Sequence, residues 1–383
     1  MDIQVENEII IIGGNHHNML GVIRALGEKG IYSNIIVTHV EKYAYVTKSK
    51  YVKEFTIISE KEEEVLNSLE KYKVLNKKAV LIPTSDFAAY VIDKNLNMLK
   101  KYFYVPSIKN KQGNIIKLMN KYNQYKLCIN NKIGCLKSIE VNLNQEIITQ
   151  GVNLPCIVKP LESIDGEKDD ISICKNTDEL NVTIKKFKAK GYKNALIQDY
   201  LEDKKECMIM GVAYNNQVII PGIAERIRCY PLKKGTTSFG KIITKSNFDY
   251  DFSQIVNLIK KIGYNGLFDI DIFKTKGKFV LNEINFRNSG NSYALVSDNI
   301  YLAYIYVLLT LGLDVSNEKL NVDKDFYFID ENYERKLLLS KQISFWDYSE
   351  ARKKTSSYFI KNKKDRRVRR WKYIYAIKRR IKK

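Results

Sequence analysis

The sequence has no uninterrupted apolar run of about 18 residues, the length at which a segment becomes a candidate membrane span, so we expect no transmembrane helix. Its six cysteines form no CxxC pair and no zinc-type spacing, which predicts isolated, reduced thiols in a cytosolic protein. The first apolar segment, Glu8 to Ile12, follows acidic residues and precedes a Gly-Gly turn, which favours a strand over a signal peptide. With 383 residues, the chain is long enough for two or three domains.

Two nucleotide-binding motifs are also missing. The opening of the chain reads as a strand, a glycine turn, an amphipathic helix and the strand IIVTHV, which predicts a βαβ unit with a parallel sheet. A glycine turn before a helix can bind phosphate, but neither GxGxxG nor the Walker lysine pattern is present, which argues against dinucleotide binding. His16 and His17 follow the turn and could touch a ligand; like His39, they are more simply interpreted as exposed histidines without partners.

The segment 264–293 carries the most informative pattern. Two strand-like runs, GLFDIDIF and KFVLNEINF, are joined by a short polar turn and predict a β-hairpin. The hairpin would place Asp271 near Glu283, and period-two alternation puts Asn285 on the same face as Glu283. These all-oxygen ligands suit Mg²⁺, and Arg287 on that face offers a fork for phosphate or carboxylate. The alternative is a hairpin with a polar, solvated outer face.

The run NEINFRNSGN, with an acidic residue twelve positions before its Glu, resembles the metal-binding end of the ATP-grasp superfamily. By that resemblance Asp271, Glu283 and Asn285 hold magnesium ions, and Arg287 faces the transferred phosphate. The resemblance covers about residues 5–310 and is strongest to stand-alone carboxylate–amine ligases of the D-aspartate ligase type, including proteins associated with cell-wall or capsule polysaccharide. It implies ATP and Mg²⁺ as cofactors.

The same resemblance implies where ATP binds. Lys159 ends the short apolar strand of LPCIVKP, where a buried ammonium needs an anion; it is similar to the lysine that contacts the α-phosphate and the adenine edge. Lys121 would reach the phosphates from a helix, and Lys168, beside the single glycine Gly166, would do so from the phosphate-covering loop. The implied adenine hinge is Gln198, Asp199, Tyr200 and Leu201, and the implied ribose acid is Glu206. Alternatively, Asp199 and Glu206 belong to a hairpin whose polar residues face solvent.

Other polar residues predict where the substrate binds. Thr84, Ser85 and Asp86 follow a buried strand, at the end where open α/β sheets bind ligands. Asp86 would face the ligand or cap the next helix. Arg226 and Arg228 alternate on one strand and predict an anion site, where the family resemblance places an arginine that orients a carboxylate or polarises an acyl phosphate. The alternative is a salt-bridged surface strand.

Together these features predict a chain of α/β and α+β class. We expect a Rossmann-like domain with a parallel sheet over residues 1–106 and the small lobe of an ATP-grasp domain over 107–197. The second ATP-grasp lobe, with the metal site, would span 198–315, followed by a C-terminal extension with a basic tail over 316–383.

The charge is concentrated in that tail. Residues 351–383 contain sixteen Lys and Arg against the single acid Asp365, so they carry +15 of the net charge of +21. Aromatic and aliphatic residues recur among the cations with a blurred amphipathic pattern. This composition predicts binding to an anionic membrane surface, which would place a cytoplasmic protein peripherally at the inner membrane. The alternatives are a grip on nucleic acid or a polyanionic substrate, and a disordered solubilising tail.

The expected activity is ATP-dependent amide formation from a small carboxylate and an amine acceptor through an acyl phosphate, on an amino acid and a cell-envelope precursor. Arg287, Arg226, Arg228 and Lys168 would act in catalysis. The sequence shows no obvious general base. One alternative is a catalytically weak ATP-grasp scaffold that serves as a membrane or nucleic-acid adaptor, although nucleic acid is the less expected partner. The other is an ATP-dependent carboxylase.

Overall fold

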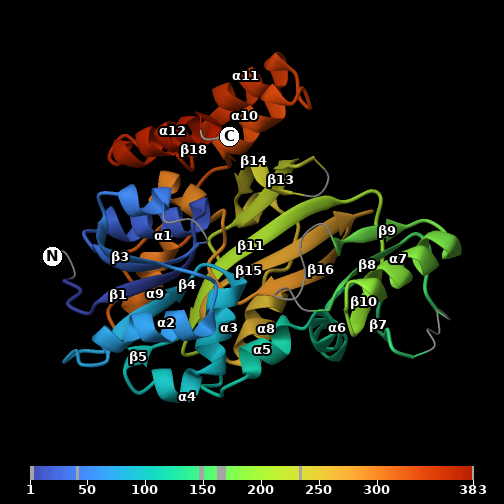
Figure 1. Ribbon diagram of the computed structural model, residues 1–383, viewed down its shortest axis with the longest axis horizontal. Coiled ribbons are helices and arrows are strands. Elements are labelled where there is room, and N and C mark those ends of the chain that lie inside the picture. Colours follow the sequence, from blue (N-terminus) through green and yellow to red (C-terminus); the bar gives the residue numbers. More distant parts are fainter. Residues whose placement is uncertain (1–3, 40–42, 146–150, 162–169, 233–234, 382–383) are drawn as a thin grey trace. The chain divides into compact units, whose positions relative to one another are not determined.

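The computed structural model describes residues 4–39, 43–145, 151–161, 170–232 and 235–381 (Figure 1). The chain divides into two compact units. The first comprises Met1–Asn114, Met208–Asp269 and Asn285–Lys383, and the second comprises Ile115–Cys207 and Ile270–Ile284. In the described part of the chain no single helix is long and apolar enough to cross a membrane. One pair of helices joined by a bend, Ser292–Asp298 and Leu302–Thr310, has the length and composition of a span when the two are taken together.

The first unit begins with a five-stranded parallel sheet, which confirms the predicted βαβ opening. Its order is β3 (Val52–Ile58), β2 (Ser33–Thr38), β1 (Ile9–Gly14), β4 (Ala79–Pro83) and β5 (Phe103–Tyr104). Its helices and 3-10 turns are α1 (His17–Gly27), η1 (Tyr45–Lys48), α2 (Glu62–Leu69), η2 (Glu70–Tyr72), α3 (Asp86–Lys94) and α4 (Leu96–Leu99). The central strands are buried on both faces, which is why they read as continuous apolar runs.

A nine-stranded sheet follows, in the order β16, β15, β11, β13, β14, β17, β18, with β12 beside β11 and β6 beside β15. The strands are β6 (Ser107–Ile108), β11 (Lys205–Tyr214), β12 (Gln217–Ile219), β13 (Ile223–Tyr230), β14 (Thr236–Ile243), β15 (Tyr264–Thr275), β16 (Lys278–Asn285), β17 (Phe326–Ile329) and β18 (Thr355–Tyr358). The helices along this part of the chain are η4 (Lys245–Asn247), α8 (Ser253–Ile262), η5 (Ser292–Asp298) and α9 (Leu302–Thr310). All nine residues of α9 are buried.

The predicted hairpin is the β15–β16 pair. Its two-residue turn, Lys276–Gly277, has φ values of +45° and +74°, the left-handed conformation that tight hairpin turns require. Both strands cross the division between the units: Asp269 and Asn285 are counted in the first, and Asp271 and Glu283 in the second.

The second unit contains an antiparallel sheet in the order β7 (Ser138–Asn142), β10 (Asn194–Asp199), β8 (Cys156–Pro160), β9 (Ser172–Cys174). Its helices are α5 (Asn114–Met119), α6 (Lys121–Asn130) and α7 (Thr177–Ala189). The expectation of isolated cysteines is wrong for Cys156 and Cys174, which register places directly opposite each other on β8 and β9. Burial and the neighbouring Cys174 raise the pKa of Cys156 to about 12, and all six cysteines are free thiols.

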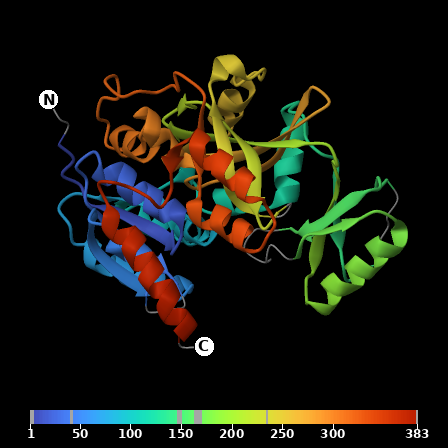
Figure 2. The same cartoon turned by 90° about the horizontal axis from the view of Figure 1, so that it is seen from above.

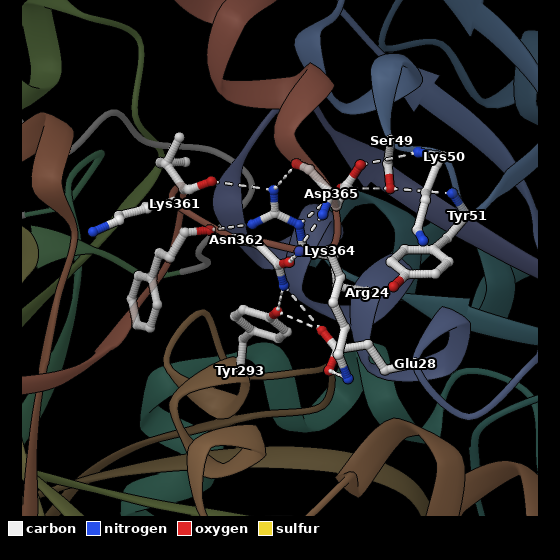
Figure 3. Close-up of polar contacts among 12 residues, drawn as sticks. Arg24, Glu28, Ser49, Lys50, Tyr51, Tyr293, Lys361, Asn362, Lys364 and Asp365 are labelled. Atoms are coloured by element: carbon white, nitrogen blue, oxygen red, sulfur yellow. Dashed lines mark hydrogen bonds and ion pairs between the residues drawn. The ribbon is translucent and has the colours of Figure 1, made fainter.

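The C-terminal extension is an ordered part of the first unit, so the alternative of a disordered tail is wrong. It runs through α10 (Glu331–Leu339), α11 (Phe345–Lys354), β18 and α12 (Arg366–Ile381). Figure 2 shows α12 lying along the N-terminal sheet domain. The extension is held by Arg24 of α1, whose Nε donates to Asp365 Oδ2 at 2.9 Å; both side chains are fully buried. Arg24 also donates to the carbonyl oxygens of Phe359 and Ile360, at 2.9 and 3.1 Å (Figure 3).

Candidate active site

A buried lysine is the centre of the candidate ATP site in the second unit. Lys159 is 6% exposed near the end of β8, and its Nζ donates to Gln198 Oε1 at 3.0 Å on the neighbouring strand β10. Burial lowers the pKa of Lys159 to about 8, since it disfavours the charged ammonium more than the carboxylates of Glu283 and Asp271 favour it. Lys121 and Lys204 lower it further. The unit therefore brings together two further lysines and two carboxylates around a lysine that lacks a directly bonded counter-charge among the described residues.

The helix α6 positions Lys121 against the predicted metal ligand. Lys121 is the first residue of α6, and its Nζ lies 3.5 Å from Glu283 Oε1. Gln124, one turn later, is buried and bonds to both backbone groups of Ile284: its Oε1 accepts from the nitrogen at 2.7 Å and its Nε2 donates to the oxygen at 2.9 Å. Gln124 thus fixes α6 to β16. The sequence interpretation missed this residue, because only the fold shows which strand it meets.

The predicted magnesium ligands lie on two neighbouring strands. Glu283 and Asn285 are two residues apart on β16 and so share a face of that strand, and Asp271 lies on β15. Among the described residues there is no cluster of three His, Cys, Asp or Glu side chains that could hold a metal ion. The predicted set needs only two carboxylates and an amide oxygen, since Mg²⁺ keeps water and phosphate oxygens as its other ligands. The chemistry of these residues fits Mg²⁺ bound together with a nucleotide.

The predicted adenine hinge spans the end of β10. The side chain of Gln198 is already used, because it accepts from Lys159 and its Nε2 donates to Ser138 Oγ at 2.9 Å. The backbone nitrogens of Asp199 and Tyr200 donate to Lys137 and Pro155 carbonyl oxygens at 3.0 and 3.1 Å. Among the described residues no hydrogen bond involves the backbone nitrogen of Leu201, so of these three amides it is the one open to an adenine ring.

The remaining predicted ATP contacts divide between described and undescribed parts of the chain. Glu206 is the second residue of β11. Near the hinge, Lys204 lies over the rings of Tyr200 and Phe273, with Nζ 4.8 and 4.4 Å from the centroids, a cation that the sequence interpretation did not single out. Lys168 and Gly166 lie outside the described residues.

In the first unit Arg287 lies between two carboxylates. Its Nε donates to Asp86 Oδ1 at 3.0 Å, and its Nη1 lies 3.5 Å from Asp269 Oδ2. The helix-cap alternative for Asp86 is wrong, because Ser85 caps α3 by accepting from the nitrogen of Ala88. Burial raises the pKa of Asp269, and Arg287 opposes that shift. Asp269 was missed, although it lies two residues before Asp271 and shares its face of β15.

The two strand arginines have different partners. A register irregularity in β13 lies between Arg226 and Arg228. Arg228 binds Glu334 of α10 through two nitrogens, at 3.0 and 2.7 Å, and the Glu334 side chain is fully buried. Arg226 donates from Nε to Thr237 Oγ1 at 3.1 Å. The charge of Arg228 is therefore met within the protein, as the salt-bridge alternative expected.

The expectation that His16 and His17 are exposed and unpartnered is wrong. His16 caps α1, since its Nδ1 accepts from the nitrogen of Asn18, and its Nε2 lies 3.2 Å from Tyr333 Oη. His17 is 3% exposed, and its Nδ1 lies 2.8 Å from Asp330 Oδ2. Burial alone would raise the pKa of Asp330, but the hydrogen bond and charge of His17 and the charge of Lys372 lower it to about 2.

Comparison with solved structures shows which fold the protein has. The biotin carboxylase domain of Hydrogenobacter thermophilus 2-oxoglutarate carboxylase, solved with MgADP and bicarbonate, matches with a TM-score of 0.67 at 16% identity, over 85% of this chain and 74% of that one. The L-amino acid ligase of Bacillus licheniformis matches with a TM-score of 0.64 at 12% identity, over 85% and 80%. The protein has the ATP-grasp fold, as the sequence predicted.

One relative aligns with this chain over almost the full length of both proteins. The chain is 24% identical to the D-aspartate ligase of Enterococcus faecium, over 97% of this chain and 95% of that protein, and is a distant homologue of it. No family model matches the chain. The likeness includes the C-terminal extension, because the alignment covers almost the entire chain.

Proposed function

We propose that the protein is an ATP-dependent carboxylate–amine ligase, which phosphorylates a carboxylate and then joins the acyl phosphate to an amine. The observation that supports it best is the cluster around Lys159, where Lys121, Lys204, Glu283 and Asp271 surround a buried lysine that has no bonded counter-ion among the described residues. A buried ammonium of this kind favours binding of a polyanion. The full-length homology to D-aspartate ligase supports the choice of an amide-forming reaction.

Each group has a role that follows from its chemistry. Lys159 and Lys121 would neutralise the nucleotide phosphates, with Lys168 assigned the same role by family resemblance, and the backbone of the hinge would hold the adenine. Asp271, Glu283 and Asn285 would hold Mg²⁺, which when bound offsets the charge of the β- and γ-phosphates. Arg287 and Arg226 would stabilise the oxygen that gains charge as the amine attacks.

The test is release of phosphate from Mg-ATP by the purified protein, measured against a panel of amino acids and small carboxylates with and without amine acceptors. The panel includes amine-bearing cell-envelope precursors, the acceptor class that we propose. We expect one pair to stimulate release, and Glu283→Gln to lower it at least about 100-fold because a charged metal ligand is lost. Glu140→Gln, an exposed glutamate of the same unit, is the matched control and should match the parent. Full turnover in Glu283→Gln would refute the assignment.

Bicarbonate belongs in the same panel. The solved biotin carboxylase domain with this fold was crystallised with bicarbonate, and a carboxylase would release phosphate with bicarbonate in place of an amino acid. Stimulation by bicarbonate alone, with carbamate or carboxylate product, would replace the ligase proposal by the carboxylase one.

We also propose that α12 attaches the protein peripherally to an anionic membrane surface on the cytoplasmic side. Its buried side holds Val368, whereas the exposed residues of its first two turns are Arg366, Arg367, Arg369, Arg370 and Trp371. Cations at a lipid surface contribute about 1 kcal/mol each at low salt, and an exposed tryptophan suits the interface. Replacing the four arginines by glutamine should abolish flotation with phosphatidylserine vesicles and leave ATP turnover unchanged. Retained flotation, or binding to nucleic acid instead, would refute the proposal.

A further inference from the structure

Three buried polar atoms in the first unit lie around the segment Ser289–Gly290–Asn291. His17 Nε2, Asp269 Oδ1 and Asn291 Oδ1 have no hydrogen-bond partner among the described residues. Their side chains belong to residues only 3%, 7% and 6% exposed. The segment lies close to His17, since a Cβ atom added at Gly290 would lie 3.0 Å from Nε2. The Ser289 side chain is near enough to Asp269 to oppose the rise that burial causes in the pKa of Asp269. Buried polar groups rarely go unpaired, so three beside one segment indicate a ligand.

The segment is held firmly beside the start of α1. Asn18 Nδ2 donates to the carbonyl oxygens of Thr84 and Asn288 at 3.0 and 2.8 Å, and Asn288 Nδ2 donates back to Asn18 Oδ1 at 2.6 Å. Asn288 joins this segment to Arg287, the predicted phosphate-facing arginine. The arrangement around Gly290 is therefore a built part of the unit.

When His17 is neutral, all three unpaired atoms are acceptors. Asp330 is fixed as the N-cap of α10, where Oδ1 accepts from the nitrogens of Asn332 and Tyr333, and its Oδ2 lies at His17 Nδ1. In neutral His17 the Nδ1 proton therefore points at a carboxylate, and Nε2 carries a lone pair. Asn291 Nδ2 donates to Met208 Sδ at 3.1 Å, which leaves its Oδ1 as the unpaired atom.

A primary ammonium complements this set. It presents three N–H donors and a positive charge, which match an imidazole nitrogen, an amide oxygen and the second oxygen of a carboxylate whose first oxygen faces Arg287. The Asp269 side chain keeps one tenth of its surface exposed, although Oδ1 itself is buried. Anions are disfavoured here, because none of the three atoms donates.

We propose that these three atoms bind the amine substrate as its ammonium and that His17, positioned by Asp330, is the general base that converts it to the nucleophilic amine. The inference rests on the proposed ligase function. The ammonium gives one proton to His17 Nε2, and the imidazolium is stabilised by the Asp330 carboxylate. The free amine then forms the C–N bond, the bond from carbon to the phosphate oxygen breaks, and the second proton leaves with the phosphate. Asp330 belongs to the C-terminal extension, so the extension completes the site.

The experiment compares two nucleophiles. Hydroxylamine is largely neutral at pH 7 and needs no base, so with ATP and the carboxylate substrate it traps the acyl phosphate as a hydroxamate. His17→Gln should lower amide formation at least about 100-fold, the lower end of a general base's contribution, and retain hydroxamate formation. Asp330→Asn should act in the same direction while keeping the helix cap, because Asn caps as well as Asp. Asp325→Asn, which removes a carboxylate paired with Lys241 at 2.8 Å, is the matched control and should leave both products unchanged.

Two results would overturn the inference: equal losses of amide and hydroxamate in both variants, which mean a structural role, or unchanged amide formation in His17→Gln. A parent protein that forms no hydroxamate with any carboxylate would refute the ligase function itself and this inference with it. The hydroxamate control thus separates the two failures.

Discussion

Replacing Arg24 by Met should strongly destabilise the first unit. The guanidinium is fully buried and donates to Asp365 and to the carbonyl oxygens of Phe359 and Ile360. After replacement Asp365 keeps its hydrogen bonds from Ser49 Oγ and the Lys50 nitrogen but loses its counter-charge. Breaking one partner of a buried pair costs about 3–5 kcal/mol, because a charge is left uncompensated away from water.

Urea unfolding of the full chain, followed by tryptophan fluorescence, measures this loss. Trp371 lies on α12, which follows Asp365 directly, and so reports on the extension. The double variant Arg24→Met with Asp365→Asn should recover part of the stability, with a coupling of about 0.5–3 kcal/mol between the two sites. Lys354→Gln, which removes an exposed ion pair with Glu350, should change nothing measurable. A loss below about 1 kcal/mol for Arg24→Met would refute the view that this pair anchors the extension.

Three further predictions follow from buried polar groups. Lys159→Met should stabilise the nucleotide-free protein by about 1–3 kcal/mol, since a lysine whose pKa falls to about 8 carries its charge at a cost, and should abolish stabilisation by MgADP; retained stabilisation by MgADP would contradict the role of Lys159. Because the pKa of Asp330 falls from 3.8 unfolded to about 2 folded, it should add about 2 kcal/mol above about pH 4, a contribution lost as pH falls towards 2; Asp330→Asn should flatten that part of the stability curve, and an unchanged curve would contradict the ion pair. Gln124→Leu leaves both backbone groups of Ile284 unpaired and should cost about 1–3 kcal/mol and raise the KM for ATP; an unchanged KM would show that α6 does not position Lys121 for the nucleotide.

The sequence predicted strands best where they are buried on both faces, because their apolar residues then form continuous runs. Strands β1 and β4 are buried on both faces, so their apolar runs predicted a parallel sheet. Strand β3 was missed because it lies at the edge of the sheet and exposes Lys53, Glu54 and Phe55, which blurs the pattern.

The candidate ATP site could be predicted from the sequence because burying a lysine costs free energy and is therefore rare. A lysine at the end of an apolar strand singled out Lys159, and the cluster that the structure places around it includes Lys121, Glu283 and Asp271. The use of the Gln198 side chain by Lys159 follows from the pairing of β8 with β10, which composition does not specify.

The contact between His17 and Asp330 could not be predicted from the sequence. His17 and Asp330 are far apart in the chain, and only the path of the C-terminal extension brings them to 2.8 Å. The one sequence feature that indicated a contact of the extension was Asp365, the single acid among the cations of the tail. A lone carboxylate in so basic a segment indicates a specific partner, which is Arg24.

The ligase mechanism is tested most directly by oxygen transfer. With the carboxylate substrate labelled with ¹⁸O at both oxygens, and with Mg-ATP and the amine acceptor present, an acyl phosphate requires one labelled oxygen to leave with the phosphate. We expect one ¹⁸O in each phosphate released, and the other in the amide product. Unlabelled phosphate, with the second labelled oxygen recovered in AMP or water instead, would contradict the ligase mechanism.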